Sequence, residues 1–166
     1  MKKLFLVVVL WPVLAGCKKD EEVGPAQVKR ASLVKAASWI QTAATVTPAI
    51  NGVTSYFMID QFFRACNRDD LYRYAENGTY TAEEGASKCA TADPDVFHQG
   101  TWRLTQDEER LLLEYVFRGA NNQISEQQVV VREVVVLNDQ QMQLRYRLSD
   151  NAGTVYTFTD TYQPRP

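Results

Sequence analysis

The side chains in this sequence best suited to nucleophilic or metal chemistry are three cysteines, Cys17, Cys66 and Cys89, and a single histidine, His98. One histidine cannot supply a multi-histidine metal site, and three cysteines are too few for a closed four-ligand zinc site without other residue types. A cysteine close to His98 could form a thiolate–imidazole pair, but nothing in the spacing singles the histidine out. We therefore expect no metal, no cofactor and no catalytic residues, and we interpret His98 as a loop residue ahead of a strand.

Composition and motifs disfavour two further classes of protein. The 166 residues, 45% hydrophobic and 23% charged, are sized and composed for one globular domain. A formal net charge of -2 offers no basic face for the phosphate neutralisation that nucleic-acid binding requires. No nucleophile elbow, phosphate-binding loop or closely spaced acid pair at a strand end is present. We therefore expect neither a nucleic-acid partner nor an enzyme, and we expect a monomer.

Residues 1–16 have the three-part layout of a secretory signal. The chain starts with the positively charged MKK, continues with the largely apolar Leu4–Leu14, and places the small residues Ala15 and Gly16 directly before Cys17. The apolar run is shorter than the about 20 residues that a membrane-spanning helix needs. A signal peptide over 1–16 is therefore favoured over a transmembrane anchor.

The four residues Leu14-Ala15-Gly16-Cys17 resemble a bacterial lipobox. In that motif the cysteine sulfur receives a diacylglycerol, the peptide bond before the cysteine is cut, and the new amino terminus is acylated. The resemblance implies lipid attachment at Cys17 and stable membrane anchoring, because each buried CH₂ contributes about 0.8 kcal/mol. The alternative is an ordinary signal peptide with a cysteine nearby.

The segment after Cys17 is polar, and we assign residues 17–31 to a lipidated, flexible tether. Its charged start, Lys18–Glu22, has two interpretations. It is either a solvated acidic linker or, by resemblance, the surface-export signal of lipoproteins in some Gram-negative bacteria. We therefore expect an outer-membrane lipoprotein of a Gram-negative bacterium, exposed on the cell surface if the export interpretation holds.

Cys66 and Cys89 would then lie outside the cytoplasm, where paired cysteines persist as disulfides. A bridge between them is the simplest assignment. It would stabilise the fold by about 3 kcal/mol through the loop that it closes. The alternative is a catalytic thiol, which would need His98 nearby.

The rest of the chain has the pattern of short strands joined by turns. Alternation of apolar and polar residues is clearest over Met142–Leu148 and Thr154–Tyr162, which predict a hairpin. Further strands are predicted over 36–46, 71–74, 79–81, 100–104, 111–117 and 125–137. Asn77-Gly78 predicts a two-residue type I′ turn. Residues 36–46 also fit a helical stripe, and a short helical turn is predicted within 56–65.

About eight strands, mostly in sequential hairpins, predict a closed sheet, because an open one leaves vulnerable edges. We therefore predict an all-β domain over residues 32–166. Its fold is an antiparallel up-and-down β-barrel with one short helix and a disulfide. A barrel of about eight strands can be filled by side chains or hold one small ligand.

Several short segments carry a family resemblance through their order and spacing. They are Trp39-Ile40-Gln41-Thr42, Cys66-Asn67-Arg68-Asp69-Asp70, Asn77-Gly78-Thr79-Tyr80, Gly85, Lys88-Cys89, Gly100-Thr101-Trp102-Arg103-Leu104 and Thr161-Tyr162. Together, over about Ser32 to Tyr162, they resemble the bacterial lipocalin-like domain of small lipoproteins. The resemblance implies an up-and-down barrel with an internal cavity and a Cys66–Cys89 disulfide. Ala37 stands where the Gly-x-Trp motif of typical lipocalins has glycine, and no clear threonine-aspartate-tyrosine motif follows, so no ligand is carried over.

Six aromatic side chains are candidates for the lining of such a cavity. They are Trp102, Tyr115, Phe117, Tyr146, Tyr156 and Phe158. Large aromatic residues are more often core fillers than ligand contacts, so this assignment competes with a packed interior.

Three charged side chains, Arg132, Glu133 and Asp160, are candidates for polar anchors. Arg132 and Glu133 lie on opposite faces of 129–137, so one of them points into the barrel unless a β-bulge turns both outward. A buried charge is costly unless it is paired or bound to ligand. We therefore favour a bulge or a rim position for this pair, and a rim position for Asp160.

Three functions compete at this point. The first, which we favour, is non-catalytic binding of a small hydrophobic or amphipathic ligand, and it predicts an internal cavity. The second is a protein-interaction module, a filled barrel that displays loops such as those around Asp93 and Asn121 and an exposed apolar patch. The third, an enzyme, has the least support.

Overall fold

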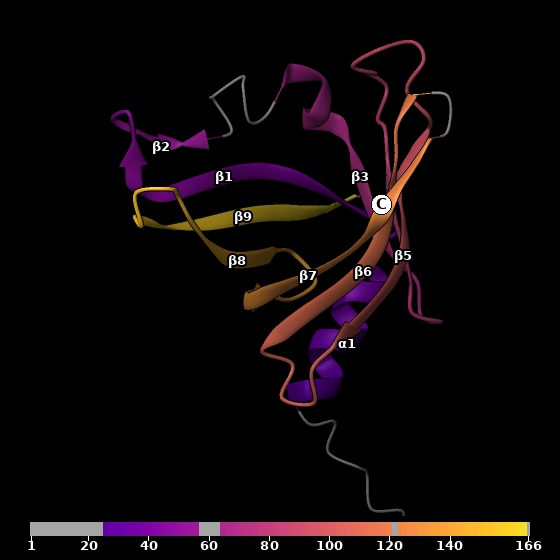
Figure 1. The fold of residues 1–166 in the computed structure, drawn as a ribbon. Helices are drawn as coiled ribbons and strands as arrows, with labels where there is room; N and C mark the ends of the chain where they lie inside the picture. Colours follow the sequence, from indigo (N-terminus) through magenta and orange to yellow (C-terminus); the bar gives the residue numbers. More distant parts are fainter. Residues whose placement is uncertain (1–24, 57–63, 121–122, 166) are drawn as a thin grey trace, which may run out of the picture.

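The computed structural model describes residues 25–56, 64–120 and 123–165, whose strands form one antiparallel sheet that closes on itself (Figure 1). Residues 1–24, including Cys17, lie outside the described residues. Lipid attachment, signal cleavage and surface export therefore stay predictions. Within the described ranges, no helix is both long enough and apolar enough to cross a membrane.

One helix, a short 3-10 helix and nine strands make up this part of the chain. In chain order they are α1 (Pro25–Lys35), β1 (Ser38–Ile50), β2 (Val53–Ser55), η2 (Ala65–Asp69), β3 (Leu71–Tyr74), β4 (Thr79–Glu83), β5 (Val96–Leu104), β6 (Arg110–Arg118), β7 (Ile124–Leu137), β8 (Met142–Ser149) and β9 (Val155–Arg165).

Strand β1 closes the barrel by pairing with both ends of the meander. Strands β3 to β9 pair in sequence, and β1 pairs with β9 from Ser38 opposite Arg165 to Thr47 opposite Thr157. Near its start β1 also pairs with β3, where Trp39 lies opposite Tyr72. The short β2 pairs with the end of β1. The predicted eight-stranded antiparallel barrel is therefore confirmed, and residues 36–46 contribute to a strand rather than a helix.

The hairpin between β3 and β4 is confirmed, but the predicted type I′ turn is wrong. A type I′ turn needs positive φ at both central residues, whereas of Asn77 and Gly78 only Gly78 has one, at 84°. The Gly78 N–H bonds to the Ala75 carbonyl at 2.9 Å, and the Ala75 N–H bonds to the Thr79 carbonyl at 2.9 Å. Gly78 therefore ends a longer loop that returns the chain to β4.

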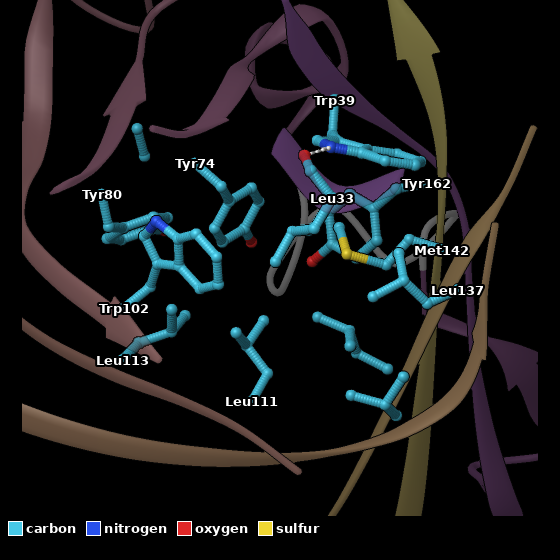
Figure 2. Packing of buried hydrophobic residues seen from close by; sticks show 13 residues of the cluster. Leu33, Trp39, Tyr74, Tyr80, Trp102, Leu111, Leu113, Leu137, Met142 and Tyr162 are labelled. Atoms are coloured by element: carbon cyan, nitrogen blue, oxygen red, sulfur yellow. Dashed lines mark hydrogen bonds between the residues drawn. The ribbon is translucent and has the colours of Figure 1, made fainter. Parts of the chain in front are cut away.

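Helix α1 covers one end of the barrel (Figure 1) and corrects the expectation of a tether over its residues 25–31. Its last turn buries Leu33 completely, and the Leu33 carbonyl accepts a hydrogen bond of 3.0 Å from the indole N–H of the fully buried Trp39 (Figure 2). Residues 25–31 resembled a linker because Val28 is their one large aliphatic side chain. Two apolar side chains near the end of the helix, Leu33 and Val34, seat it against the core.

The buried side chains form two clusters inside the barrel. The larger cluster lies beside α1 and packs Leu33 and Trp39 with Tyr74, Trp102, Leu111, Met142 and Tyr162, among others (Figure 2). The smaller one consists of Ala44, Val46, Tyr56 and Phe158. Strand alternation directs most of these side chains inward, while Leu33 comes from α1 and Tyr56 follows β2.

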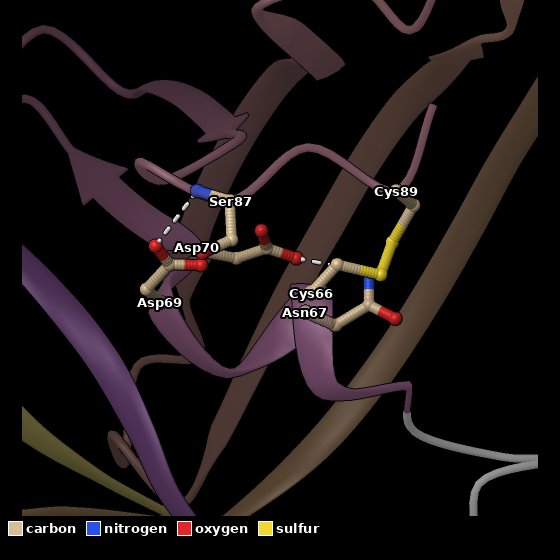
Figure 3. Close-up of a disulfide and its surroundings, with 6 residues drawn as sticks. All are labelled: Cys66, Asn67, Asp69, Asp70, Ser87 and Cys89. Carbon is tan, nitrogen blue, oxygen red and sulfur yellow. Dashed lines mark hydrogen bonds between the residues drawn. A yellow bond between two sulfur atoms is a disulfide. The ribbon is translucent and has the colours of Figure 1, made fainter. Parts of the chain in front are cut away.

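The Cys66–Cys89 disulfide is present and confirms the simplest assignment of these two cysteines (Figure 3). The bridge joins η2 to the loop after β4, with 5.2 Å between the two Cα atoms. Beside it, a side-chain oxygen of Asp69 accepts a hydrogen bond of 3.0 Å from the Ser87 N–H. Most of the predicted helical turn within 56–65 lies outside the described residues, and η2 itself starts at Ala65.

Replacing both cysteines by alanine should lower the free energy of unfolding by about 3 kcal/mol, because the bridge restricts the unfolded chain. Urea unfolding followed by intrinsic fluorescence measures the change. Wild-type protein treated with dithiothreitol is the matched control and should lose the same stability. An unchanged urea midpoint in the double variant would contradict a stabilising bridge.

Candidate functional site

A cavity of about 230 Å³ lies inside the barrel, next to both core clusters. Every one of the eight barrel strands contributes to its wall. The wall residues are Gln41, Tyr56, Tyr72, Tyr74, Tyr80, His98, Leu113, Tyr115, Val130, Arg132, Leu144, Tyr146, Asp160 and Tyr162. The cavity is smaller than most drug-sized ligand pockets, which hold about 300–1,000 Å³.

Tyrosines dominate this wall because two-residue spacing directs them inward, as in Tyr72 and Tyr74 of β3. Ring contacts link them around the barrel, with centroid distances of 5.4 Å for Tyr72–Tyr162 and 5.7 Å for Tyr80–Tyr115. Burial raises the pKa of these phenols, which stay protonated at neutral pH. Among the described residues, their hydroxyls have no hydrogen-bond partner. As groups of residues that line the cavity, they can donate or accept hydrogen bonds there.

Arg132 also points into the cavity, and the expectation that a bulge or rim position would keep it out is wrong. Its guanidinium carbon lies 3.7 Å from the centre of the Tyr146 ring, a cation–π contact. Glu133, the next residue, points outward and forms an exposed ion pair with Arg145. Register shifts do occur in β7, but they lie between Ile124 and Gln127 and between Val134 and Val136. Neither lies at Arg132, which keeps its inward direction.

Asp160 is buried in the wall of the cavity, so the rim position expected for it is also wrong. Its carboxylate accepts a hydrogen bond of 3.1 Å from the side-chain amide of Gln41, on the neighbouring strand β1. Burial raises the pKa of Asp160 to about 7, although the hydrogen bond from Gln41 acts in the opposite direction. The carboxyl group therefore changes its charge close to neutral pH.

His98 belongs to β5 rather than to a loop, and its ring lies inside the barrel. The ring centroid is 4.3 Å from that of Tyr115. Burial lowers the pKa of His98 to about 4, so the imidazole is neutral under ordinary conditions. Within the described ranges its buried Nδ1 has no hydrogen-bond partner. Both cysteines of this part of the chain are joined in the disulfide, so His98 has no thiolate to activate here.

The six aromatic candidates for the cavity lining separate into two groups. Tyr115 and Tyr146 line the cavity. Trp102 is packed in the larger core cluster and donates its indole N–H to the Ala75 carbonyl at 2.9 Å. Phe158 belongs to the smaller cluster, and Tyr156 packs against it. Phe117, 43% exposed, lies past Tyr115 on β6 and borders a smaller pocket outside the cavity.

Sequence reasoning missed several wall residues, chiefly Tyr72, Tyr74, Tyr80, His98 and Gln41. The alternation of tyrosines through β3 and β4 was the available signal, since it directs three of them to one face. Nothing in the sequence pointed to Gln41, because its role depends on a partner 119 residues away.

The side chains of the cavity wall offer groups that can hold a ligand. Across the described residues, no group of three or more His, Cys, Asp or Glu side chains could hold a metal ion. Asp69 and Asp70 instead bond to Ser87 and Asn67 beside the disulfide. The cavity combines one permanent cation, one carboxyl group with a pKa near neutral and several phenols around an apolar patch of Leu113, Val130 and Leu144.

Comparisons with known proteins add the following findings. No protein-family model matches the sequence, and no curated protein matches it either. Bovine odorant-binding protein, solved with a selenium-containing odorant, aligns with a TM-score of 0.40 and 11% identity over 82% of this chain and 73% of its own. Aphrodisin, a sex pheromone from female hamster, aligns with a TM-score of 0.35 and 7% identity over 79% and 75% of the two chains. The class defined here, a closed antiparallel barrel with an internal cavity, rests on the strand pairing itself.

Replacing Asp160 by asparagine should remove a pH-dependent loss of stability. The pKa of Asp160 is about 7 in the folded protein and 3.8 in the absence of structure. Its stabilising contribution is therefore complete below pH 3.8 and is lost as the pH rises through about 7. Between pH 5 and pH 8 the free energy of unfolding of the wild type should fall by roughly 2–3 kcal/mol more than that of the variant.

Urea unfolding at pH 5, 6, 7 and 8 measures this difference. Burial also raises the pKa of Asp70, to about 6, but Asp70 is present in both proteins and its contribution cancels. Equal pH dependence of the two proteins would show that Asp160 is not held in the buried environment described here.

Proposed function

We propose that this protein is a membrane-anchored, lipocalin-like lipoprotein that binds a small hydrophobic or amphipathic molecule inside its barrel without chemical conversion. The observation that carries the proposal is the cavity of about 230 Å³ at the centre of the barrel. A barrel that served only as a scaffold for its loops would gain stability from a solid apolar interior. Here the interior instead presents free phenol hydroxyls and a guanidinium to an internal space.

Binding fits this cavity better than catalysis does. His98 is neutral and packed among aromatic rings, and both described cysteines are bonded to each other. Asp160 is held by Gln41 instead of facing a nucleophile that it could activate. The apolar patch can bury a hydrocarbon or aromatic group of a ligand, and the polar groups around it can fix the orientation of that ligand.

A protein-interaction module is the second candidate, and a different feature favours it. Val129, Val131 and Val135 lie on the outer face of β7 with large exposed fractions, 67%, 47% and 43%. Exposed apolar groups that lie together can mark a protein contact. Recovery of the protein without a bound small molecule, but with a stoichiometric protein partner, would favour this function over the first.

Replacing Val130 by phenylalanine should abolish ligand binding, because Val130 faces the cavity and a larger side chain would fill part of it. Native mass spectrometry of protein purified from its own cell envelope should show wild type carrying a reproducible small-molecule adduct, with the adduct lost in the variant.

Val131→Phe is the matched control, since Val131 is the next residue and points outward. This variant should keep the adduct. Circular dichroism verifies that both variants are folded. A wild-type protein that gives only the mass of the polypeptide, with its lipid where present, would contradict the proposed function.

Anchoring is proposed to occur through lipid attached to Cys17 after removal of residues 1–16. The proposal is supported by the sequence Leu14-Ala15-Gly16-Cys17 and by the apolar run before it. With the charged segment Lys18–Glu22 as an export signal, the barrel would lie on the outer surface of a Gram-negative outer membrane, linked to it by the short segment before α1.

Replacing Cys17 by alanine should prevent acylation and leave residues 1–16 attached. Intact-mass measurement of protein from its own host should give, for wild type, the chain from Cys17 plus diacylglycerol and an amide-linked acyl chain. In phase separation with a mild detergent, the wild-type protein should partition into the detergent phase. A chain that starts at residue 18 lacks the lipid and should partition into the aqueous phase. A wild-type mass equal to an unmodified chain would contradict lipidation.

A further inference from the structure

Arg132 is the feature of the cavity that the proposed function leaves unexplained. Among the described residues, its guanidinium forms no ion pair and no hydrogen bond, and its one recorded contact is with the face of the Tyr146 ring. Two arginines on neighbouring parts of the sheet behave differently. Arg145 pairs with Glu133, and Arg73 pairs with Glu83 at 3.0 Å. The arginine that lines the cavity therefore has no carboxylate partner among the described residues, although it is partly withdrawn from bulk water.

A guanidinium inside a protein needs a compensating anion or acceptor, because desolvation of an unpaired charge is costly. Asp160 does not fill this role: it shares the cavity, yet it lies beyond ion-pair distance of Arg132 and is held by Gln41. The planar N–H groups of arginine match carboxylate, sulfate and phosphate oxygens in a two-point geometry. Tyr146 covers one face of the guanidinium, so the N–H groups at its edge can still donate hydrogen bonds to an anionic group of a ligand.

The phenols around Arg132 add further donors. The positive charge of Arg132 acts on Tyr74, Tyr80, Tyr115 and Tyr146, where it opposes the rise in pKa that burial causes. These hydroxyls therefore lie within electrostatic reach of the guanidinium. They are protonated and have no hydrogen-bond partner among the described residues. One part of the cavity thus combines a fixed cation with several O–H donors.

We infer that the molecule bound in the barrel carries an anionic head group, a carboxylate, sulfate or phosphate, which pairs with Arg132 and accepts hydrogen bonds from the surrounding tyrosines. This inference rests on the proposed function and specifies its ligand class. The apolar part of the ligand packs against Leu113, Val130 and Leu144. The cavity of about 230 Å³ is smaller than the about 300–1,000 Å³ of drug-sized ligand pockets. The ligand is therefore a short-chain or single-ring anion rather than a long-chain lipid.

Isothermal titration calorimetry with matched probes tests the inference. The probes are octanoate and octan-1-ol, which share a chain length and differ in head-group charge, together with octyl sulfate and octyl phosphate. Wild-type protein should bind octanoate at least tenfold more tightly than octan-1-ol. The comparison among octanoate, octyl sulfate and octyl phosphate shows which anionic head the site prefers.

Arg132→Met keeps a side chain of similar length and removes the charge and the donors. It should weaken octanoate binding at least tenfold and change octan-1-ol binding less than threefold. Arg145→Met makes the same substitution on the outer face of the barrel and should leave both affinities unchanged. Arg132→Lys, which keeps the charge without the planar donor edge, should retain part of the preference for octanoate and serves as the test if Arg132→Met does not fold.

Two outcomes would overturn the inference while leaving cavity binding intact. One is equal affinity of wild type for octanoate and octan-1-ol. The other is octanoate binding that is unchanged in both Arg132 variants. Failure of the proposed function looks different, because none of the probes would then bind the wild type and no adduct would accompany the protein from its own envelope.

Discussion

The pairing of β1 with β9 is the interaction on which the rest of the structure depends. It joins the first barrel strand to the last, from Ser38 opposite Arg165 to Thr47 opposite Thr157, and it turns a meander with two free edges into a closed wall. The same pairing brings Gln41 next to Asp160 across 119 residues of sequence. The β1–β9 pairing therefore both closes the barrel and places two polar side chains in the cavity wall. If this seam opened, the carboxyl group of Asp160 would lose both its burial and its hydrogen bond.

The closed wall gives every strand an inward face, and this interior is unequally filled. Beside α1, Leu33 and Trp39 seat the helix in a dense cluster of large side chains. Further along, tyrosine hydroxyls, Arg132 and Asp160 border an internal space. Polar groups withdrawn from water destabilise a fold unless something satisfies them. Apolar packing is therefore concentrated beside α1 and in the small second cluster. The buried polar side chains, which cost stability, border the cavity, where water or a ligand can hydrogen-bond to them.

Alternation along the sequence was sufficient to predict the strands, their hairpins and the closed barrel. The disulfide also followed from the sequence, since two cysteines remained once Cys17 was set aside. Helix α1 was missed because its first seven residues have the composition of a linker and its large aliphatic core contacts, Leu33 and Val34, come near its end. His98 was placed in a loop because β5 begins at Val96, earlier than the alternating segment suggested. In each case the missing information was a tertiary contact, which local sequence does not contain.

The cavity residues show where a general rule of stability gives the wrong answer. Alternation directed either Arg132 or Glu133 inward and left the same question for Asp160, and the cost of burying a charge argued for a bulge or a rim position instead. The structure keeps Arg132 and Asp160 inside, by different means. Asp160 gains a hydrogen bond from Gln41 and a pKa near neutral, so it can give up its charge. The Arg132 guanidinium contacts the face of the Tyr146 ring, and a single aromatic face is an incomplete replacement for water. An aliphatic residue at this position would avoid that cost, which a bound anion would offset instead.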